Sequence, residues 1–263
     1  MFLFLFLIFQ LALVACSDQT MEQSGVIKVQ PTSAEIAKWS YDESTGPEYW
    51  GELDPSNSAC IKGNEQSPIN LEFAQAKVDK KIKRNQIYYE PTTFTFLNNG
   101  HTIQANATTE SNIIIVEGNA YTLAQFHFHT PSEHQFNGQH YDMELHLVHS
   151  DHNGKLAVIG VLIQEGGENK LLASVWGDLP KDNTKKESSE KHLIHLQALL
   201  PQNQMSFHYN GSLTTPPCTE QVKWIVLEQP IEMSKQQIQA FQEIFSDNHR
   251  PVQPLNNREI IKN

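Results

Sequence analysis

The sequence predicts a mainly β (α+β) fold, built as a single domain with small peripheral helices. Short runs of alternating apolar and polar residues fill the middle of the chain, turn signals separate several of them, and helical spacing is rare. The composition, with 39% hydrophobic and 19% charged residues, is ordinary for a soluble globular protein. At 263 residues the chain could hold two small domains, but no change in composition and no repeat after Trp39 marks a boundary.

Period-two alternation identifies the expected strands, because successive side chains of a strand point to opposite faces of a sheet. The expected strands are residues 93–97, 112–116, 124–130, 143–149, 156–164 and 221–228. Tight turns are expected where Asn and Gly adjoin, at Asn98-Asn99-Gly100, Asn137-Gly138 and Asn153-Gly154.

Two short helices are expected outside the sheet. Ser234 is a good N-cap, and Ile238, Phe241 and Phe245 follow it at spacings of three and four, which predicts an amphipathic helix. A second short helix is expected over residues 170–176.

The first residues indicate export. Met1 to Val14 is almost wholly apolar but shorter than the ~20 residues of a membrane-spanning helix, so it is typical of a signal peptide. Residues 13–16, Leu-Val-Ala-Cys, resemble the lipobox of bacterial lipoproteins, in which the cysteine is lipidated; a plain secretory signal is the alternative. We expect a signal peptide over 1–16, a flexible tether over 17–36, and a folded domain over 37–262 in the periplasm or cell envelope.

The three cysteines fit this export. If Cys16 carries lipid, Cys60 and Cys218 are left as a pair that an oxidising compartment would allow to form a disulfide. Two free buried thiols are the alternative.

The formal charge of −11 bears on partners. A nucleic-acid surface needs clustered Lys and Arg, and the one basic run, residues 80–84, is short and is interpreted as a solvated face. No nucleic-acid partner is expected, and membrane contact is expected only through an N-terminal lipid.

Histidines are concentrated in one stretch: seven of the twelve lie between His127 and His152. In the run 125–129, alternation puts Gln125, His127 and His129 on one face of a strand and both Phe rings on the other. The two imidazoles are then about 7 Å apart along the strand, close enough to share one ion.

A second run, residues 144–148, places Glu144, His146 and Val148 on one face. If the two strands are neighbours, three imidazoles converge. Three neutral nitrogen ligands without cysteine suit Zn²⁺ with an open fourth position, and such a site lowers the pKa of a bound water to about 7. Gln125 and Glu144 are on the right faces to accept hydrogen bonds from the outer ring nitrogens.

An ordered series of further motifs accompanies the histidines. The segments are Gly46-Pro47-Glu48-Tyr49-Trp50, Gln66-Ser67-Pro68-Ile69-Asn70-Leu71, Asn98-Asn99-Gly100-His101, Ser132-Glu133-His134 and Gly211-Ser212-Leu213-Thr214-Thr215-Pro216-Pro217-Cys218. Together with 125–129 and 144–149, this series resembles the α-class carbonic anhydrases of the bacterial exported type, from Trp39 to Lys262.

The resemblance implies a single domain on a large, twisted, mostly antiparallel central sheet, with zinc at the bottom of a conical cleft. It also implies the reversible hydration of carbon dioxide to bicarbonate and a proton, by attack of a zinc-bound hydroxide. His127, His129 and His146 match the zinc ligands of the family.

Other roles follow from the same resemblance. Thr214 matches the residue that accepts the proton of the hydroxide, and Glu133 matches the carboxylate that accepts from Thr214. His101 matches the proton shuttle, which the chemistry needs because every cycle must export a proton. Tyr41 and Thr215 match residues that order water in the cleft. The residues that match the substrate pocket are Val148, Val158, Leu213, Thr215 and Trp224, and all of them except Thr215 form its apolar wall.

Two rival interpretations remain open from the sequence. His127-x-His129-x-x-x-Glu133 is also similar to the metal motif of cupin iron proteins, in which Glu133 would be a ligand. Alternatively, the chain could be a binding module that keeps the fold but has no turnover.

Overall fold

A 12-stranded sheet forms the centre of the protein, and a separate two-stranded sheet adjoins it. The computed structural model describes residues 39–79, 86–183 and 192–263, all within one unit, Ile36–Asn263. The predicted signal peptide, the tether and Cys16 lie outside the described residues and stay predictions. Within the described part, no helix is long and apolar enough to span a membrane.

The strands are β1 Asn70–Leu71, β2 Lys77–Val78, β3 Gln86–Tyr88, β4 Thr92–Asn98, β5 Ile103–Ala107, β6 Ile113–Val116, β7 Asn119–His129, β8 Gln135–Phe136, β9 Met143–Ser150, β10 Leu156–Glu165, β11 His192–Ile194, β12 Ser206–Ser212, β13 Glu220–Met233 and β14 Ile261–Lys262. The helices are α1 Trp50–Leu53, α2 Ala59–Lys62, α3 Ala173–Trp176, α4 Leu196–Leu199 and α5 Lys235–Gln242, with 3-10 turns η1 Glu43–Thr45 and η2 Pro55–Asn57.

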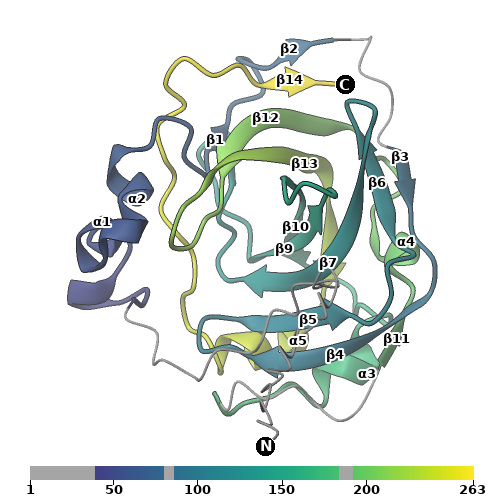
Figure 1. Cartoon of the computed structure of the whole chain (residues 1–263). Coiled ribbons are helices and arrows are strands. Elements are labelled where there is room, and N and C mark those ends of the chain that lie inside the picture. Colours follow the sequence, from purple (N-terminus) through teal and green to yellow (C-terminus); the bar gives the residue numbers. More distant parts are fainter. Residues whose placement is uncertain (1–38, 80–85, 184–191) are drawn as a thin grey trace, which may run out of the picture. The chain divides into compact units, whose positions relative to one another are not determined.

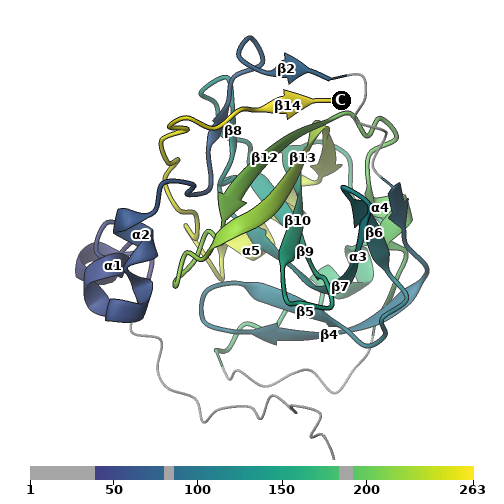
Figure 2. The same ribbon diagram turned by 45° about the horizontal axis from the view of Figure 1, so that its top comes forward.

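The large sheet runs in the order β11-β4-β5-β7-β9-β10-β13-β12-β14-β2, and β6 joins β3 to β7 (Figure 1). Its pairs are antiparallel except β10–β13 and β14–β2, so the expected mostly antiparallel, twisted sheet is confirmed. In both views α1 and α2 lie together on one side of the sheet, and α3 and α4 lie on the other (Figure 2).

Two apolar clusters cover the two faces of the central strands. Phe126 and Phe128 of β7 and Leu145 and Leu147 of β9 belong to the main cluster, which α5 also enters. Val148, one residue from Leu147, belongs to a second, smaller cluster. Because β9 is buried on both faces, its sequence alternates in side-chain type but not in exposure.

Every expected strand is present, with ends that differ by a few residues. The helix after Ser234 is confirmed: the Ser234 side chain caps it, and Gln237 completes a capping box. Phe245 lies beyond the end of this helix but still packs on Phe241. The helix expected over 170–176 is shorter, because only Ala173–Trp176 is helical.

The expected turns are also present. Asn137 and Gly138 have φ of +49° and +80°, the left-handed region that Asn and Gly adopt most readily. Strands β5 and β12 were not among the expected strands, although both contain alternating residues: Ile103 and Ala105 of β5 are buried, and Gln104 between them is partly exposed.

Cys60 and Cys218 form a disulfide, so the pairing is confirmed and two free thiols are excluded. The bridge joins α2 to the loop between β12 and β13. Both sulfurs are buried in a small cluster around Trp50.

His149 of β9 is a completely buried histidine. Its Nε2 lies 2.7 Å from the Tyr89 hydroxyl, and burial lowers the pKa of His149 from 6.5 to about 3, although backbone carbonyls of Ala157 and Leu147 act against the shift.

Loss of the disulfide should destabilise the fold. Replacing both cysteines, Cys60→Ser with Cys218→Ser, is expected to lower the free energy of unfolding by about 3–5 kcal/mol, because the bridge closes a very long loop of the unfolded chain. Urea titration of the oxidised protein and the double variant measures the difference. A loss below about 1 kcal/mol would contradict this entropic account.

His149 should make stability depend on pH. Its folded-state pKa is depressed, so between pH 6.5 and about 3 the unfolded chain binds a proton that the folded chain does not, and stability falls as pH falls. His149→Gln is expected to reduce this slope by up to about 1.4 kcal/mol per pH unit. Urea titrations at several pH values test this. The exposed His152→Gln should keep the wild-type slope, and a wild-type slope in His149→Gln would refute the assignment.

Candidate metal centre and catalytic cleft

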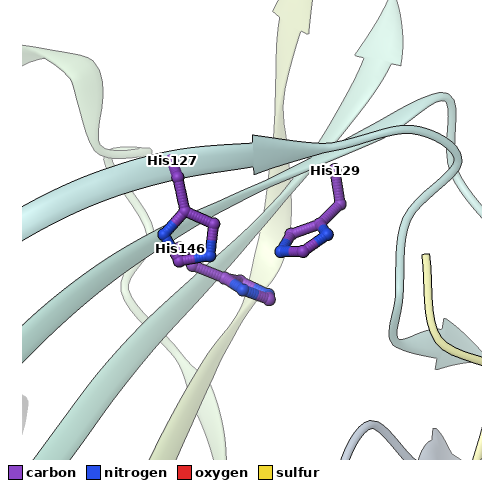
Figure 3. Close-up of side chains that lie close together, drawn as sticks. All are labelled: His127, His129 and His146. Carbon is purple, nitrogen blue, oxygen red and sulfur yellow. The ribbon is translucent and has the colours of Figure 1, made fainter. Parts of the chain in front are cut away.

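Three imidazoles converge where β7 and β9 pair. The two strands are antiparallel with His127 directly opposite His146, and His129 lies two residues further along the same face of β7. The three rings point toward one another (Figure 3). One nitrogen of each ring lies within 4.8 Å of the other two, near the separation of at most about 4 Å that a shared ion would impose.

The outer nitrogen of each ring is already occupied. His127 Nδ1 lies 2.8 Å from Gln125 Oε1, His129 Nδ1 donates to the carbonyl of Asn248 at 2.7 Å, and His146 Nε2 lies 2.9 Å from Glu144 Oε1. The inner nitrogens, Nε2 of His127, Nε2 of His129 and Nδ1 of His146, are therefore the ones that can bind an ion.

Burial keeps the three rings neutral. It lowers the pKa of His127 well below 6.5, lowers that of His129 to about 4, and lowers that of His146 against the opposing effect of Glu144. Near neutral pH each inner nitrogen thus offers a lone pair. His129 Nε2 is buried without a hydrogen-bond partner among the described residues, which is costly unless a ligand satisfies it.

Glu133 is fully buried beside this set but is not part of it. Its Oε2 lies 3.5 Å from His129 Nε2 and 3.8 Å from His146 Nδ1, and Oε1 accepts from the backbone N–H of Arg250 at 2.9 Å. The group of mutually close ligand atoms comprises the three histidines without Glu133. The donor set therefore fits Zn²⁺ better than the mixed set with a carboxylate ligand.

Glu144 links the centre to a hydrogen-bond network behind it. Its oxygens accept from the backbone N–H groups of Glu133 and His134 and lie 2.7 Å from His134 Nδ1. Burial alone would raise its pKa, but His134 and His146 hold the pKa of Glu144 well below its ordinary value. His134, Glu144 and His146 also lie close enough to hold an ion, but the second nitrogen of His134 bonds the Tyr209 hydroxyl at 2.7 Å. Hydrogen bonds therefore account for this second group.

Thr214 lies in the loop between β12 and β13, next to Glu133. Burial raises the pKa of Glu133, while His146 and the Thr214 hydroxyl lower it. Glu133 Oε2 nevertheless has no hydrogen bond of normal geometry in the described part of the chain. The structure brings the two expected relay residues close enough for the Thr214 hydroxyl to stabilise the Glu133 carboxylate.

A cleft of about 110 Å³ opens beside two of the histidines. Its lining is Trp39, Tyr41, Asn99, His101, Thr102, Gln104, Gln125, His127, His129 and Thr215. The His101 ring stacks on Trp39, with ring centroids 3.6 Å apart and planes 9° apart. Burial, with smaller effects of Glu133 and Asp247, raises the pKa of Tyr41, so its phenol is neutral. The cleft thus contains the expected shuttle and both residues expected to order water.

The expected substrate wall forms one row across three strands. Val158 pairs with Val148 on one side and with Trp224 on the other, and Leu213 packs on the same cluster. The Trp224 ring lies 4.9 Å from that of His146, so this wall adjoins the metal centre. A larger cavity of about 930 Å³ lies by the β6–β7 hairpin, and Trp224 is the one predicted site residue in its lining.

Sequence reasoning missed the segment after α5. Asn248 holds the outer nitrogen of His129, and the Arg250 backbone holds Glu133. The Arg250 guanidinium in turn donates to the carbonyls of Cys60 and Ser67. Because these contacts use mainly backbone groups or lie far apart in sequence, no local pattern could have identified them.

The chain is similar to known proteins over most of its length. The family model described as eukaryotic-type carbonic anhydrase matches residues 45–263. A carbonic anhydrase of Nostoc sp. is 41% identical over 88% of each chain, and one of Klebsiella pneumoniae is 39% identical over 90% of this chain and 95% of its own. The solved α-carbonic anhydrase of Thermovibrio ammonificans, in complex with sulfanilamide, is 42% identical. It superimposes with a TM-score of 0.81 over 85% of this chain and 98% of its own.

Proposed function

Because the chain belongs to the eukaryotic-type (α) carbonic anhydrase family, we propose that it hydrates carbon dioxide reversibly on Zn²⁺ held by His127, His129 and His146. The observation that carries the proposal is the convergence of three neutral imidazole nitrogens beside a cleft that His127 and His129 line. The unpartnered His129 Nε2 supports a bound cation at this point. Its relatives identify the chain as a carbonic anhydrase, and the bound metal and the roles of individual residues are what we propose.

When bound, Zn²⁺ would supply a water whose pKa is lowered to about 7, and so a nucleophile near neutral pH. The protein's part is to keep the three inner lone pairs aimed at one point. Gln125, Glu144 and the carbonyl of Asn248 do this by fixing the outer nitrogens.

Glu133 and Thr214 would orient the attack. A carboxylate beside the Thr214 hydroxyl fixes the direction in which that hydroxyl donates, and leaves its oxygen to accept from the nucleophile. Carbon dioxide offers little to hydrogen-bond, so the row of Val148, Val158 and Trp224 suits it as an apolar wall.

His101 would carry the released proton to solvent. Each cycle produces one proton, and a histidine ordinarily titrates near neutral pH. Its position in the lining of the cleft that also holds His127 and His129 supports this role.

A stopped-flow measurement of carbon dioxide hydration, with and without a zinc chelator, tests the proposed function. Activity that survives complete zinc removal would reject zinc as the required metal. Bound iron in the isolated protein would assign a different metal to the three histidines, and zinc binding without hydration would favour a binding module with the same fold.

The ligand assignment predicts loss of the metal. His127→Ala and His146→Ala are each expected to lower zinc affinity by at least about 100-fold and to abolish hydration, because removing a ligand loses more than removing a residue behind one. Metal analysis after dialysis against a chelator measures occupancy. His152→Ala, an exposed histidine beyond β9, should retain full zinc, and full occupancy in either ligand variant would refute the assignment.

The shuttle assignment predicts a buffer-dependent defect. His101→Ala is expected to lower kcat about 10- to 100-fold at low buffer concentration with little change in kcat/KM, because general acid–base groups contribute effects of this order. Added imidazole should restore kcat by carrying the proton instead. His192→Ala, in β11, is the control, and an unchanged kcat at low buffer would remove His101 from the mechanism.

A further inference from the structure

Asn248 uses every polar group of its backbone and side chain. It follows α5 and is completely buried. Its backbone N–H donates to the carbonyl of Thr130 at 3.0 Å, and its carbonyl accepts from His129 Nδ1. Its side-chain Oδ1 accepts from the N–H of Thr130 at 2.7 Å.

The remaining group of Asn248, the side-chain Nδ2, spans two segments. It donates to the carbonyl of His101 at 2.9 Å and to the carbonyl of Phe128 at 3.0 Å. Phe128 lies between the ligands His127 and His129 on β7. One amide therefore ties the backbone of the cleft residue His101 to the strand that carries two of the three imidazoles.

The turn around His101 has its own internal hydrogen bonds, and it is also bonded to the Phe128 carbonyl of β7. Asn99 Oδ1 accepts from the N–H groups of His101 and Thr102 at 2.9 Å each, which fixes the shape of the turn. Thr102 Oγ1 donates to the same Phe128 carbonyl at 2.6 Å. The Asn248 amide adds, from outside the turn, a hydrogen bond to the His101 backbone itself.

We propose that the side-chain amide of Asn248 is a positioning residue for proton transfer, which sets the place of His101 relative to the metal centre. The inference rests on the proposed function, since it assigns Asn248 to the proton-export step of that reaction. Transfer between groups held at a fixed separation is sensitive to displacements of about 1 Å. Without Nδ2 the turn would keep its shape but lose one of its ties to β7.

Two variants test this. Asn248→Asp keeps an acceptor for Thr130 and the backbone carbonyl for His129, but it loses both N–H donors. Asn248→Ser removes the same donors without adding a carboxylate, so it controls for charge and serves where Asn248→Asp fails to fold. Both are expected to lose roughly 10-fold in kcat at low buffer, beyond any loss in kcat/KM, and imidazole should restore the rate.

A second readout does not need the metal. Hydrogen exchange of the metal-free protein, followed by mass spectrometry, should show faster exchange in the peptide spanning residues 99–104 in both variants. A general loss of stability would instead accelerate exchange throughout the domain.

Asn112 supplies the matched control. It is also completely buried, its Nδ2 donates to Thr92 Oγ1 at 2.7 Å, and its Oδ1 accepts from the N–H of Glu90 at 2.8 Å. Asn112→Asp should destabilise the fold to a similar degree without a buffer-dependent defect.

The outcomes separate the two hypotheses. Absence of hydration in the wild type rejects the proposed function. His101→Ala could show the defect while both Asn248 variants keep a normal kcat at low buffer and normal local hydrogen exchange. That result overturns only the role of Asn248. An equal buffer-dependent defect in Asn112→Asp overturns it as well.

Discussion

The register between β7 and β9 is the constraint on which the metal centre depends. It places His127 opposite His146, and the apolar residues on the other face enforce it. A slip of one residue would turn Leu145 and Leu147 out of the main cluster and would turn His146 into it. Burial of those side chains, each contributing about 1.5–3 kcal/mol, therefore stabilises the geometry of the site as well as the fold.

The same burial gives the site its chemistry. Removal from water keeps the three imidazoles neutral, and it also requires that every outer N–H find an acceptor. Glu144 provides the acceptor for His146, and it does so in a tightly packed position. Gly160 of β10 pairs with His146 of β9, and a Cβ on Gly160 would lie 2.8 Å from Glu144 Oε1. The anionic carboxylate is stabilised there because His134 and two backbone N–H groups also donate to it.

Segments far apart in the chain complete the cleft. Trp39 and Tyr41 come from the start of the described residues, Thr215 comes from the loop after β12, and Asn248 comes from the segment after α5. The disulfide holds the loop after β12 to α2. Arg250 also contacts α2, since its side chain donates to the Cys60 carbonyl, while its backbone N–H donates to Glu133. The strands thus supply the ligands, while long-range contacts position the groups around them.

The sequence by itself determined the strands that carry the site and the face on which each histidine lies. Alternation is a local property, so the order of residues alone is enough to place His127 and His129 on one face of β7, away from Phe126 and Phe128. It also determined the helix that Ser234 caps, and the motif series identified the family.

The tertiary structure decided which strands are neighbours and which groups accept hydrogen bonds from the outer ring nitrogens of the three histidines. The acceptor for His129 is a backbone carbonyl 119 residues away, and a carbonyl carries no residue-type signal. Glu133 stays outside the three-histidine group for a similar reason. Its distance to His127 depends on the Arg250 backbone that holds it, which no spacing in the sequence encodes.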